Sequence, residues 1–179
     1  MVDVRAVIAE VAPLIEPQLS GKGLALDVRL PDGPCEVWAD RDKLGQVLLN
    51  LLSNAAKFTA ARNPATGAPG RVTMTVATRP GAAAGAVFLR VADTGVGIPR
   101  DKLAAVFEPF VQVATGYART GDGTGLGLAI SRDLARGMGG DLRVQSVLGE
   151  GSTFTVALRR AAGPGGGGGD RPAEAAGSA

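Results

Sequence analysis

The segment LGQVLLNLLSNAAKFT, residues 44–59, most constrains the fold, because its apolar side chains recur at helical spacing along one side. It predicts an amphipathic helix that begins near Asp40 and ends near Thr59. On a helical wheel of about 100° per residue, the apolar face contains Leu44, Val47, Leu48, Leu51, Leu52 and Ala55. The opposite face contains Lys43, Gln46, Asn50, Asn54 and Lys57. Such a helix must bury its apolar face against another element.

Strand patterns supply the partner. Apolar and polar residues alternate in several short segments, and a Gly- and Pro-containing segment between two of them predicts a hairpin. Strands are expected at residues 23–30, 35–39, 71–78, 86–93, 141–146 and 152–159.

Three further helices are expected. Residues 4–15 show helical spacing after Asp3 as a helix N-cap, and we expect Pro13 to kink the end of this helix. Another helix should begin near Arg100, and the last should span residues 126–138.

Composition excludes several classes of protein. The 179 residues are 45% hydrophobic, which is enough for one domain with a core and too little for two. The 19 basic and 17 acidic residues give a net charge of +2, which indicates neither nucleic-acid nor membrane binding. A single cysteine excludes an internal disulfide, and no apolar run reaches the roughly 20 residues of a membrane span. The N-terminal residues do not resemble a secretion signal, so we expect a cytoplasmic protein.

Two glycine-containing segments are candidates for ligand binding. DTGVGIP, residues 93–99, follows a predicted strand and permits either a plain strand-to-helix turn or the close approach of a flat ligand. GDGTGLGLAI, residues 121–130, runs into a helix, where free N–H groups can bind anionic oxygens. A loop that allows close helix packing explains this second segment equally well. It matches neither the Walker phosphate loop nor the dinucleotide-binding fingerprint, because GK[ST] and a preceding strand are missing.

Asn50 and Asn54 lie one turn apart on the polar face of the predicted central helix. Exposure to solvent alone would favour Glu, Lys or Arg, because Asn is a mediocre helix former. An amide oxygen suits Mg²⁺, and Lys57 is placed to meet a phosphate group. We therefore expect this face to line a magnesium nucleotide site, with a solvated face as the alternative.

Five segments, in this order, resemble the N box, first glycine box, F box, second glycine box and terminal hairpin of a sensor histidine kinase ATP-binding domain. They are NLLSNAAKFT, DTGVGIP, FEPF, GTGLGLAI and GGDLRVQSVLGEGSTFTVAL. The resemblance covers roughly residues 2–158, because residues 2–28 also resemble the segment that joins the family's dimerisation helices to the catalytic domain.

The resemblance implies an α/β (α+β) two-layer sandwich, as in gyrase and mismatch-repair ATPases. Its sheet would be mixed and mostly antiparallel, with about five strands and with three helices on one face. The implied regions are a remnant of the dimerisation-helix region and linker at residues 1–19 and the ATP-binding catalytic domain at 20–160. Residues 161–179 lie outside the resemblance, and we expect them to form a disordered Gly/Ala-rich tail because they have almost nothing to bury.

The resemblance also implies residue roles, with ATP and Mg²⁺ as ligands. Asp93 corresponds to the carboxylate that accepts the adenine amino group, and Asn54 corresponds to the Mg²⁺ ligand. Asn50 and Lys57 are the implied catalytic residues, since Asn50 lines the same wall and Lys57 approaches phosphate. Thr153 would assist Asp93 through its hydroxyl or a bound water. The implied contacts to the nucleotide are Asn54, Asp93, Gly95, Gly97, Gly123, Gly125, Leu126, Gly127 and Thr153.

Residues 110–122 resemble the mobile ATP lid of the family. Phe107 and Phe110 are expected to anchor this lid on the core rather than to stack on a base. Gln112 stands in the region where the family commonly has an arginine, so the lid's contacts to the γ-phosphate are in doubt.

Asn50 also distinguishes the branches of the superfamily, because gyrase-like ATPases have a glutamate general base four residues before the magnesium asparagine. An amide cannot take a proton from water, which disfavours hydrolysis and favours transfer of the γ-phosphoryl group to another nucleophile. The family's nucleophile is a histidine, and this sequence contains none.

Three functions are therefore considered. The first is the catalytic half of a histidine kinase, which phosphorylates a histidine of a dimerisation domain in trans or in a longer parent chain, with a response regulator downstream. The second is a stand-alone serine kinase acting on an anti-sigma partner, and the third is a non-catalytic nucleotide-binding module. The joining segment and the terminal hairpin favour the first, without nucleic-acid or membrane contact by the chain itself.

Overall fold

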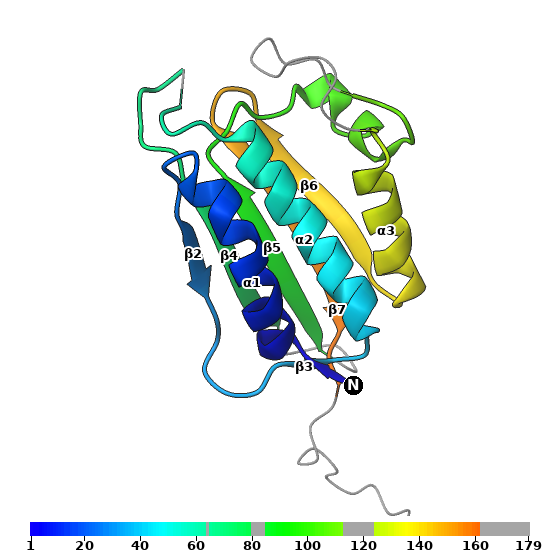
Figure 1. Ribbon diagram of the computed structural model, residues 1–179. Helices are drawn as coiled ribbons and strands as arrows, with labels where there is room; N and C mark the ends of the chain where they lie inside the picture. Colours follow the sequence, from blue (N-terminus) through cyan, green and yellow to red (C-terminus); the bar gives the residue numbers. More distant parts are fainter. Residues whose placement is uncertain (64, 80–84, 113–123, 162–179) are drawn as a thin grey trace, which may run out of the picture.

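Three α-helices cover one face of a five-stranded sheet and form a two-layer α+β sandwich with it (Figure 1). This computed structural model describes residues 1–63, 65–79, 85–112 and 124–161. The helices are α1 (Val4–Ser20), α2 (Arg41–Phe58) and α3 (Gly127–Gly137). No helix within the described ranges is both long enough and apolar enough to cross a membrane. The predicted fold class is confirmed.

The sheet has the strand order β2-β4-β5-β7-β6, in which β2 runs parallel to β4 and the other neighbours are antiparallel. Its strands are β2 (Leu26–Arg29), β4 (Val72–Arg79), β5 (Ala86–Asp93), β6 (Asp141–Val147) and β7 (Gly151–Arg159). β1 (Val2–Asp3) and β3 (Glu36–Val37) form a separate antiparallel pair. Every predicted strand is present. Strand β1 was not predicted, because two residues are too few to show an alternating pattern.

The core lies between the helices and the covered face of the sheet. Val76, Leu89, Val156 and Leu142 are register partners across four strands, and all are buried. The predicted apolar face of α2 packs on this surface, with Leu44, Val47, Leu48, Leu51 and Leu52 fully buried. Each such side chain stabilises the fold by about 1.5 to 3 kcal/mol relative to an exposed one.

Helix α1 begins after Asp3, whose side chain accepts a hydrogen bond from the Arg5 amide, as expected of an N-cap. The helix runs past Pro13 and Pro17 to Ser20, further than the sequence suggested. Both prolines lie on the exposed side, where water can satisfy the carbonyl groups that lose a partner. The buried stripe of α1 consists of Val4, Val7, Ile8, Val11, Ile15 and Leu19, and it belongs to the same core.

The helix expected near Arg100 is instead a pair of 3-10 turns, η1 (Arg100–Lys102) and η2 (Ala105–Phe107). Pro109 follows soon after, and Glu108 before it is extended, with ψ of 138°. A residue before proline disfavours the α conformation, so the helical segment is too short to propagate.

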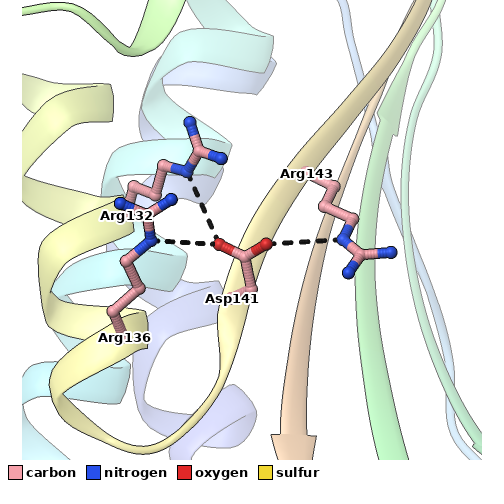
Figure 2. Close-up of polar contacts among 4 residues, drawn as sticks. All are labelled: Arg132, Arg136, Asp141 and Arg143. Carbon is pink, nitrogen blue, oxygen red and sulfur yellow. Dashed lines mark hydrogen bonds and ion pairs between the residues drawn. The ribbon is translucent and has the colours of Figure 1, made fainter.

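Helix α3 is tied to the edge strand β6 by Asp141, which lies among three arginines (Figure 2). Arg132 Nε and Arg136 Nε lie 3.5 and 3.4 Å from Asp141 Oδ1. Arg143 Nε lies 3.4 Å from Oδ2. Burial alone would raise the pKa of Asp141, but the Leu142 amide and the arginines hold that pKa below its usual range. Arg132 and Arg136 thus link α3 to β6 through Asp141, whereas Arg143 lies on β6 itself.

Candidate functional site

The first glycine segment follows β5, whose last residue is Asp93. Residues 93–97 are called the glycine loop below. The Asp93 carboxylate is half-buried, and its Oδ1 accepts a hydrogen bond from the Gly95 amide at 2.8 Å. Burial raises the pKa of the Asp93 carboxyl to about 6, while the backbone amides of Gly95 and Ser152 favour its ionised form. The loop thus presents a partly desolvated carboxyl group that can accept a hydrogen bond.

Only glycine fits at positions 95 and 97, because protein backbone occupies the space that a Cβ would need. A Cβ on Gly95 would lie 2.3 Å from the Phe58 carbonyl oxygen. A Cβ on Gly97 would lie 2.1 Å from the Val147 carbonyl oxygen, and its φ of +69° is left-handed. The Val96 amide donates to Phe58 O at 3.3 Å. The two glycines therefore seat the loop between α2 and the β6–β7 turn, whereas the sequence suggested room for a ligand.

The register of β5 and β7 places Ser152, rather than Thr153, beside Asp93. Asp93 pairs directly with Ser152, and Thr153 pairs with Ala92. Because side chains alternate along a strand, Thr153 points to the sheet face away from the helices. Ser152 is buried on the same face as Asp93. Contrary to the expectation, Thr153 is therefore not positioned to assist Asp93. A shift of one residue along a strand moves a side chain to the opposite face of the sheet.

Two polar residues that hold the loop, Asn63 and Ser146, were not among the site residues expected from the sequence. Asn63 Nδ2 donates to the carbonyl oxygens of Thr94 and Gly149, both at 2.9 Å. The Ser146 hydroxyl accepts a hydrogen bond from the Ile98 amide at 2.7 Å. Asn before Pro marks a turn, which is the only sequence signal that Asn63 gives. Ser146 gives none, because its role depends on the pairing of β6 with β7.

Asn50, on α2, connects the two helices that flank the site. Its Nδ2 donates to the Ser131 hydroxyl on α3 at 2.8 Å. Its Oδ1 lies against Gly127, where a Cβ would come within 2.5 Å of that oxygen. Asn50 is half-buried, so the solvated-face interpretation does not apply to it. The second glycine segment is thereby held against the middle of α2.

Asn54 lies one turn further along α2 and is also half-buried. Within the described part of the chain, its side chain makes no hydrogen bond. Lys57 follows in the last turn, where its exposed ammonium lies 5.2 Å from the centre of the Phe58 ring. The polar face of α2 thus offers an amide oxygen and a cation near the glycine loop.

The second glycine segment leads into α3. Gly123 lies outside the described residues. Gly125 has a φ of +70°, and its carbonyl oxygen accepts from the Phe110 amide at 3.0 Å. Leu126 is the helix N-cap and provides no side-chain cap, and Gly127 begins the helix. Backbone N–H groups of this first turn are therefore available to an anion.

The two phenylalanines expected to anchor the lid behave differently. Phe107 packs against the core, and the guanidinium carbon of Arg132 lies 4.6 Å from its ring centre, which confirms its structural role. Phe110 is 74% exposed, so its expected anchoring is wrong. Its φ of +64° and its backbone contact with Gly125 turn the ring outward. Residues 113–122 of the expected lid lie outside the described residues.

These elements meet at one end of the sandwich, opposite the N-terminus (Figure 1). No group of three or more acidic, Cys or His side chains that could hold a metal occurs in the described ranges. Mg²⁺ commonly binds through one or two protein oxygens together with phosphates and water, so a lone amide such as Asn54 is sufficient. The half-buried Asp93 carboxylate suits a base amino group, and the open α3 N-terminus suits phosphates. The residues present therefore fit a magnesium nucleotide.

Two solved structures share the fold of this chain. The mycobacterial sensor histidine kinase MprB superposes with a TM-score of 0.74 at 30% identity, over 89% of this chain and 97% of that one. Full-length ShkA in complex with AMPPNP superposes with a TM-score of 0.73 at 36% identity, over 91% of this chain and 32% of that one.

The curated relatives include a sensor protein and a sensor histidine kinase. The chain is 39% identical to the aerobic respiration control sensor protein ArcB of Escherichia coli (strain K12) over 160 residues, which is 88% of this chain and 19% of ArcB. It is 44% identical to the sensor histidine kinase RcsC of the same strain over 128 residues, which is 72% of this chain and 12% of RcsC. The chain thus spans about a fifth or less of the length of these relatives.

The family of histidine kinase-, DNA gyrase B-, and HSP90-like ATPases matches residues 39–162, which includes α2, the glycine loop, α3 and the terminal hairpin. The matched range holds every site element described above, and the sensor histidine kinase MprB shares the fold at 30% identity. The chain therefore belongs to this ATPase family and is homologous to the catalytic domains of sensor histidine kinases.

Proposed function

We propose that the chain binds Mg·ATP and transfers the γ-phosphoryl group to a histidine of another domain or chain, in cytoplasmic two-component phosphorelay signalling. The observation that carries this proposal is the order of groups along α2. Phe58 contacts the glycine loop that holds Asp93, Asn54 lies one turn back, and Asn50 contacts the start of α3. A magnesium nucleotide that lies along α2 would present its base, its metal and its phosphates in the same order. Each of these groups would then meet a suitable partner.

Asp93 is the proposed partner of the base. Its ionised carboxylate would accept a hydrogen bond from the adenine amino group, because a carboxylate has about four acceptor sites and the backbone amides of Gly95 and Ser152 use only part of them. The bond forms in a partly desolvated place, where an electrostatic interaction is stronger than in water. Gly97 and the buried Ser152 shape the surrounding backbone. The site would thus select a base with an amino donor.

Asn54 is the proposed ligand of Mg²⁺. Its amide oxygen is hard and neutral, and within the described residues it is not engaged elsewhere. Bound Mg²⁺ would supply charge neutralisation on the phosphate oxygens. Lys57 is the proposed cation that meets phosphate from the last turn of α2. Gly125, Leu126 and Gly127, with Gly123 outside the described residues, would offer backbone N–H groups.

Asn50 supports transfer to a protein acceptor rather than to water. Its amide is bonded to Ser131 and has no basic lone pair to activate a water molecule. The sequence contains no histidine, so the acceptor would be a histidine-bearing dimerisation domain in trans or in a longer parent chain. A response regulator would then receive the phosphoryl group. The relatives named above are sensor proteins, which supports this placement.

Calorimetric titration with Mg·ADP tests the binding step, with Asp93→Asn as the diagnostic variant. The variant should bind ADP about 10- to 150-fold more weakly, because a hydrogen bond to a charged acceptor contributes about 1.5 to 3 kcal/mol. Asp133→Asn removes an equal charge from an exposed position on α3 and should bind ADP like the wild type. Unchanged ADP affinity in Asp93→Asn would exclude Asp93 as the base partner.

A further inference from the structure

Asn63 is a buried polar residue in the loop between α2 and β4, and 2% of its surface is exposed. Its Nδ2 lies 2.9 Å from Thr94 O, 2.9 Å from Gly149 O and 3.4 Å from Gly95 O. These acceptors come from two segments far apart in the sequence, the glycine loop and the turn between β6 and β7. One side-chain amide therefore joins three segments.

The other end of the Asn63 side chain serves its own loop. Oδ1 accepts hydrogen bonds from the amides of Ala65 at 2.8 Å and Thr66 at 3.1 Å, in the manner of an Asx turn. The Asn63 backbone also accepts from the Gly67 amide at 2.8 Å. The oxygen thus shapes the loop, while the nitrogen bridges the two neighbouring segments. Because different atoms of the side chain accept and donate, a substitution can remove the donated hydrogen bonds and keep the accepted ones.

The bridge bears directly on Asp93. Thr94 and Gly95 follow Asp93 in the chain, and the Gly95 amide donates to the Asp93 carboxylate at 2.8 Å. The glycine loop and the hairpin turn are also linked by the Gly149 amide, which donates to Val96 O at 2.8 Å. Asn63 supplies the side-chain hydrogen bonds that hold the same two segments together.

We propose that Asn63 is a positioning residue of the nucleotide site, which holds the glycine loop against the β6–β7 turn and so sets where the Asp93 carboxylate meets the base. This inference rests on the proposed role of Asp93. Asn63 lies on the side of the loop that faces the protein, so it acts through Thr94 and Gly95 rather than by contact with nucleotide. Loss of the Asn63 bridge should therefore weaken binding of the base. It should leave binding of the metal and the phosphates unchanged, because α2 and α3 form that part of the site.

Asn63→Asp is the diagnostic variant. A carboxylate keeps the two acceptor contacts to Ala65 and Thr66, but it loses the N–H donors and faces the carbonyl oxygens of Thr94 and Gly149. ADP affinity should fall about tenfold or more, because buried acceptors lose their partner. Affinity for Mg·tripolyphosphate, which has no base, should stay unchanged.

Thr66→Ala is the matched control in the same loop. Thr66 is exposed, and its hydroxyl accepts only a local hydrogen bond from the Ala68 amide at 3.3 Å among the described residues. The control should bind ADP and tripolyphosphate like the wild type. Hydrogen exchange provides a readout that needs no ligand. The Gly149 amide should exchange faster in Asn63→Asp than in Thr66→Ala, because the hairpin turn is released.

Several results would overturn the proposal. A folded Asn63→Asp protein with unchanged ADP affinity and unchanged Gly149 exchange would exclude a bridge, and equal weakening of both probes would indicate general loss of structure. If Asn63→Asp does not fold, Asn63→Ser carries the same test, since a serine hydroxyl can maintain the local turn. If neither variant folds, Asn63 is needed for folding and the positioning role is refuted. Absence of ADP binding in the wild type would refute the proposed function, while the exchange experiment would still decide the bridge.

Discussion

Among the described residues, Asp93 has a carboxyl group whose pKa is shifted strongly by its surroundings. Burial raises its pKa from 3.8 to about 6, although two backbone amides favour the charged form. Between these two pH values the folded protein binds the proton more tightly than the unfolded chain. The free energy of unfolding therefore falls as pH rises through this window. An ionised Asp93 at neutral pH is a cost to stability, as expected of a group that serves binding.

Asp93→Asn should therefore stabilise the nucleotide-free protein while it weakens ADP binding. An amide oxygen can still accept from Gly95, and it carries no charge to desolvate. We expect the free energy of unfolding at pH 7 to rise by about 1 to 3 kcal/mol. Urea denaturation at several pH values measures the difference between variant and wild type. That difference should shrink as pH falls from 7 towards 4, and a variant less stable than wild type at pH 7 would contradict the assignment.

At the scale of elements, α2 determines the layout of the site. Its apolar face anchors it on the sheet, and Asn50, Asn54 and Phe58 follow one another along the helix at intervals of four residues. Four residues of an α-helix, slightly more than one turn, advance by about 6 Å. The helix thereby sets the spacing between the start of α3, the proposed metal ligand and the glycine loop. A rigid, well-packed element is well suited to this task.

Asn54→Ala should remove the magnesium-dependent part of ATP binding, while adenosine binding should survive. The amide is proposed to contact the metal and not the base, so only one part of the ligand loses a partner. ATP titrations in Mg²⁺ and in a chelator measure the effect. Gln46→Ala is the control, because Gln46 is exposed on the same helix. A variant that keeps the full magnesium effect would show that Asn54 is no ligand.

Gly95→Ala should destabilise the fold, because its Cβ would lie 2.3 Å from the backbone oxygen of Phe58. Overpacking of this kind costs about 1 to 3 kcal/mol. Gly137→Ala is the matched control at the end of α3, where a Cβ would meet no atom within 4 Å. The control should be neutral or slightly stabilising, since alanine favours helix. Thermal unfolding compares the two variants, and equal melting temperatures would refute the close approach of loop and helix.

The limits of sequence-based prediction follow from the range of the interactions. The apolar face of α2 and the alternating strands were predictable, because local periodicity decides which side is buried. Ser152 could not be distinguished from Thr153, because strand register depends on pairing between distant segments. Phe110 was misplaced because its outward turn depends on contact with Gly125. Asn63 was missed because its partners lie about 30 and 86 residues away in the chain.

At the scale of the whole molecule, one core extends from α1 through α2 to the face of the sheet that the helices cover. Val7 and Ile15 of α1 are buried in the same cluster as Leu48 of α2 and Leu89 of β5. Helix α1 therefore folds together with the ATPase sandwich, although the family match begins only at residue 39. The candidate site lies at the opposite end of the sandwich from the N-terminus (Figure 1).

Transfer of label from γ-labelled ATP to a separately expressed, histidine-bearing dimerisation domain tests the central claim most directly. The chain has no histidine, so it should acquire no acid-labile phosphohistidine itself. The acceptor should become labelled weakly, because without a covalent tether the effective concentration is low. The label should be lost in acid and stable in base. Acid-stable label on a serine would support the serine-kinase alternative and contradict the account, as would the absence of label on any acceptor despite tight Mg·ATP binding.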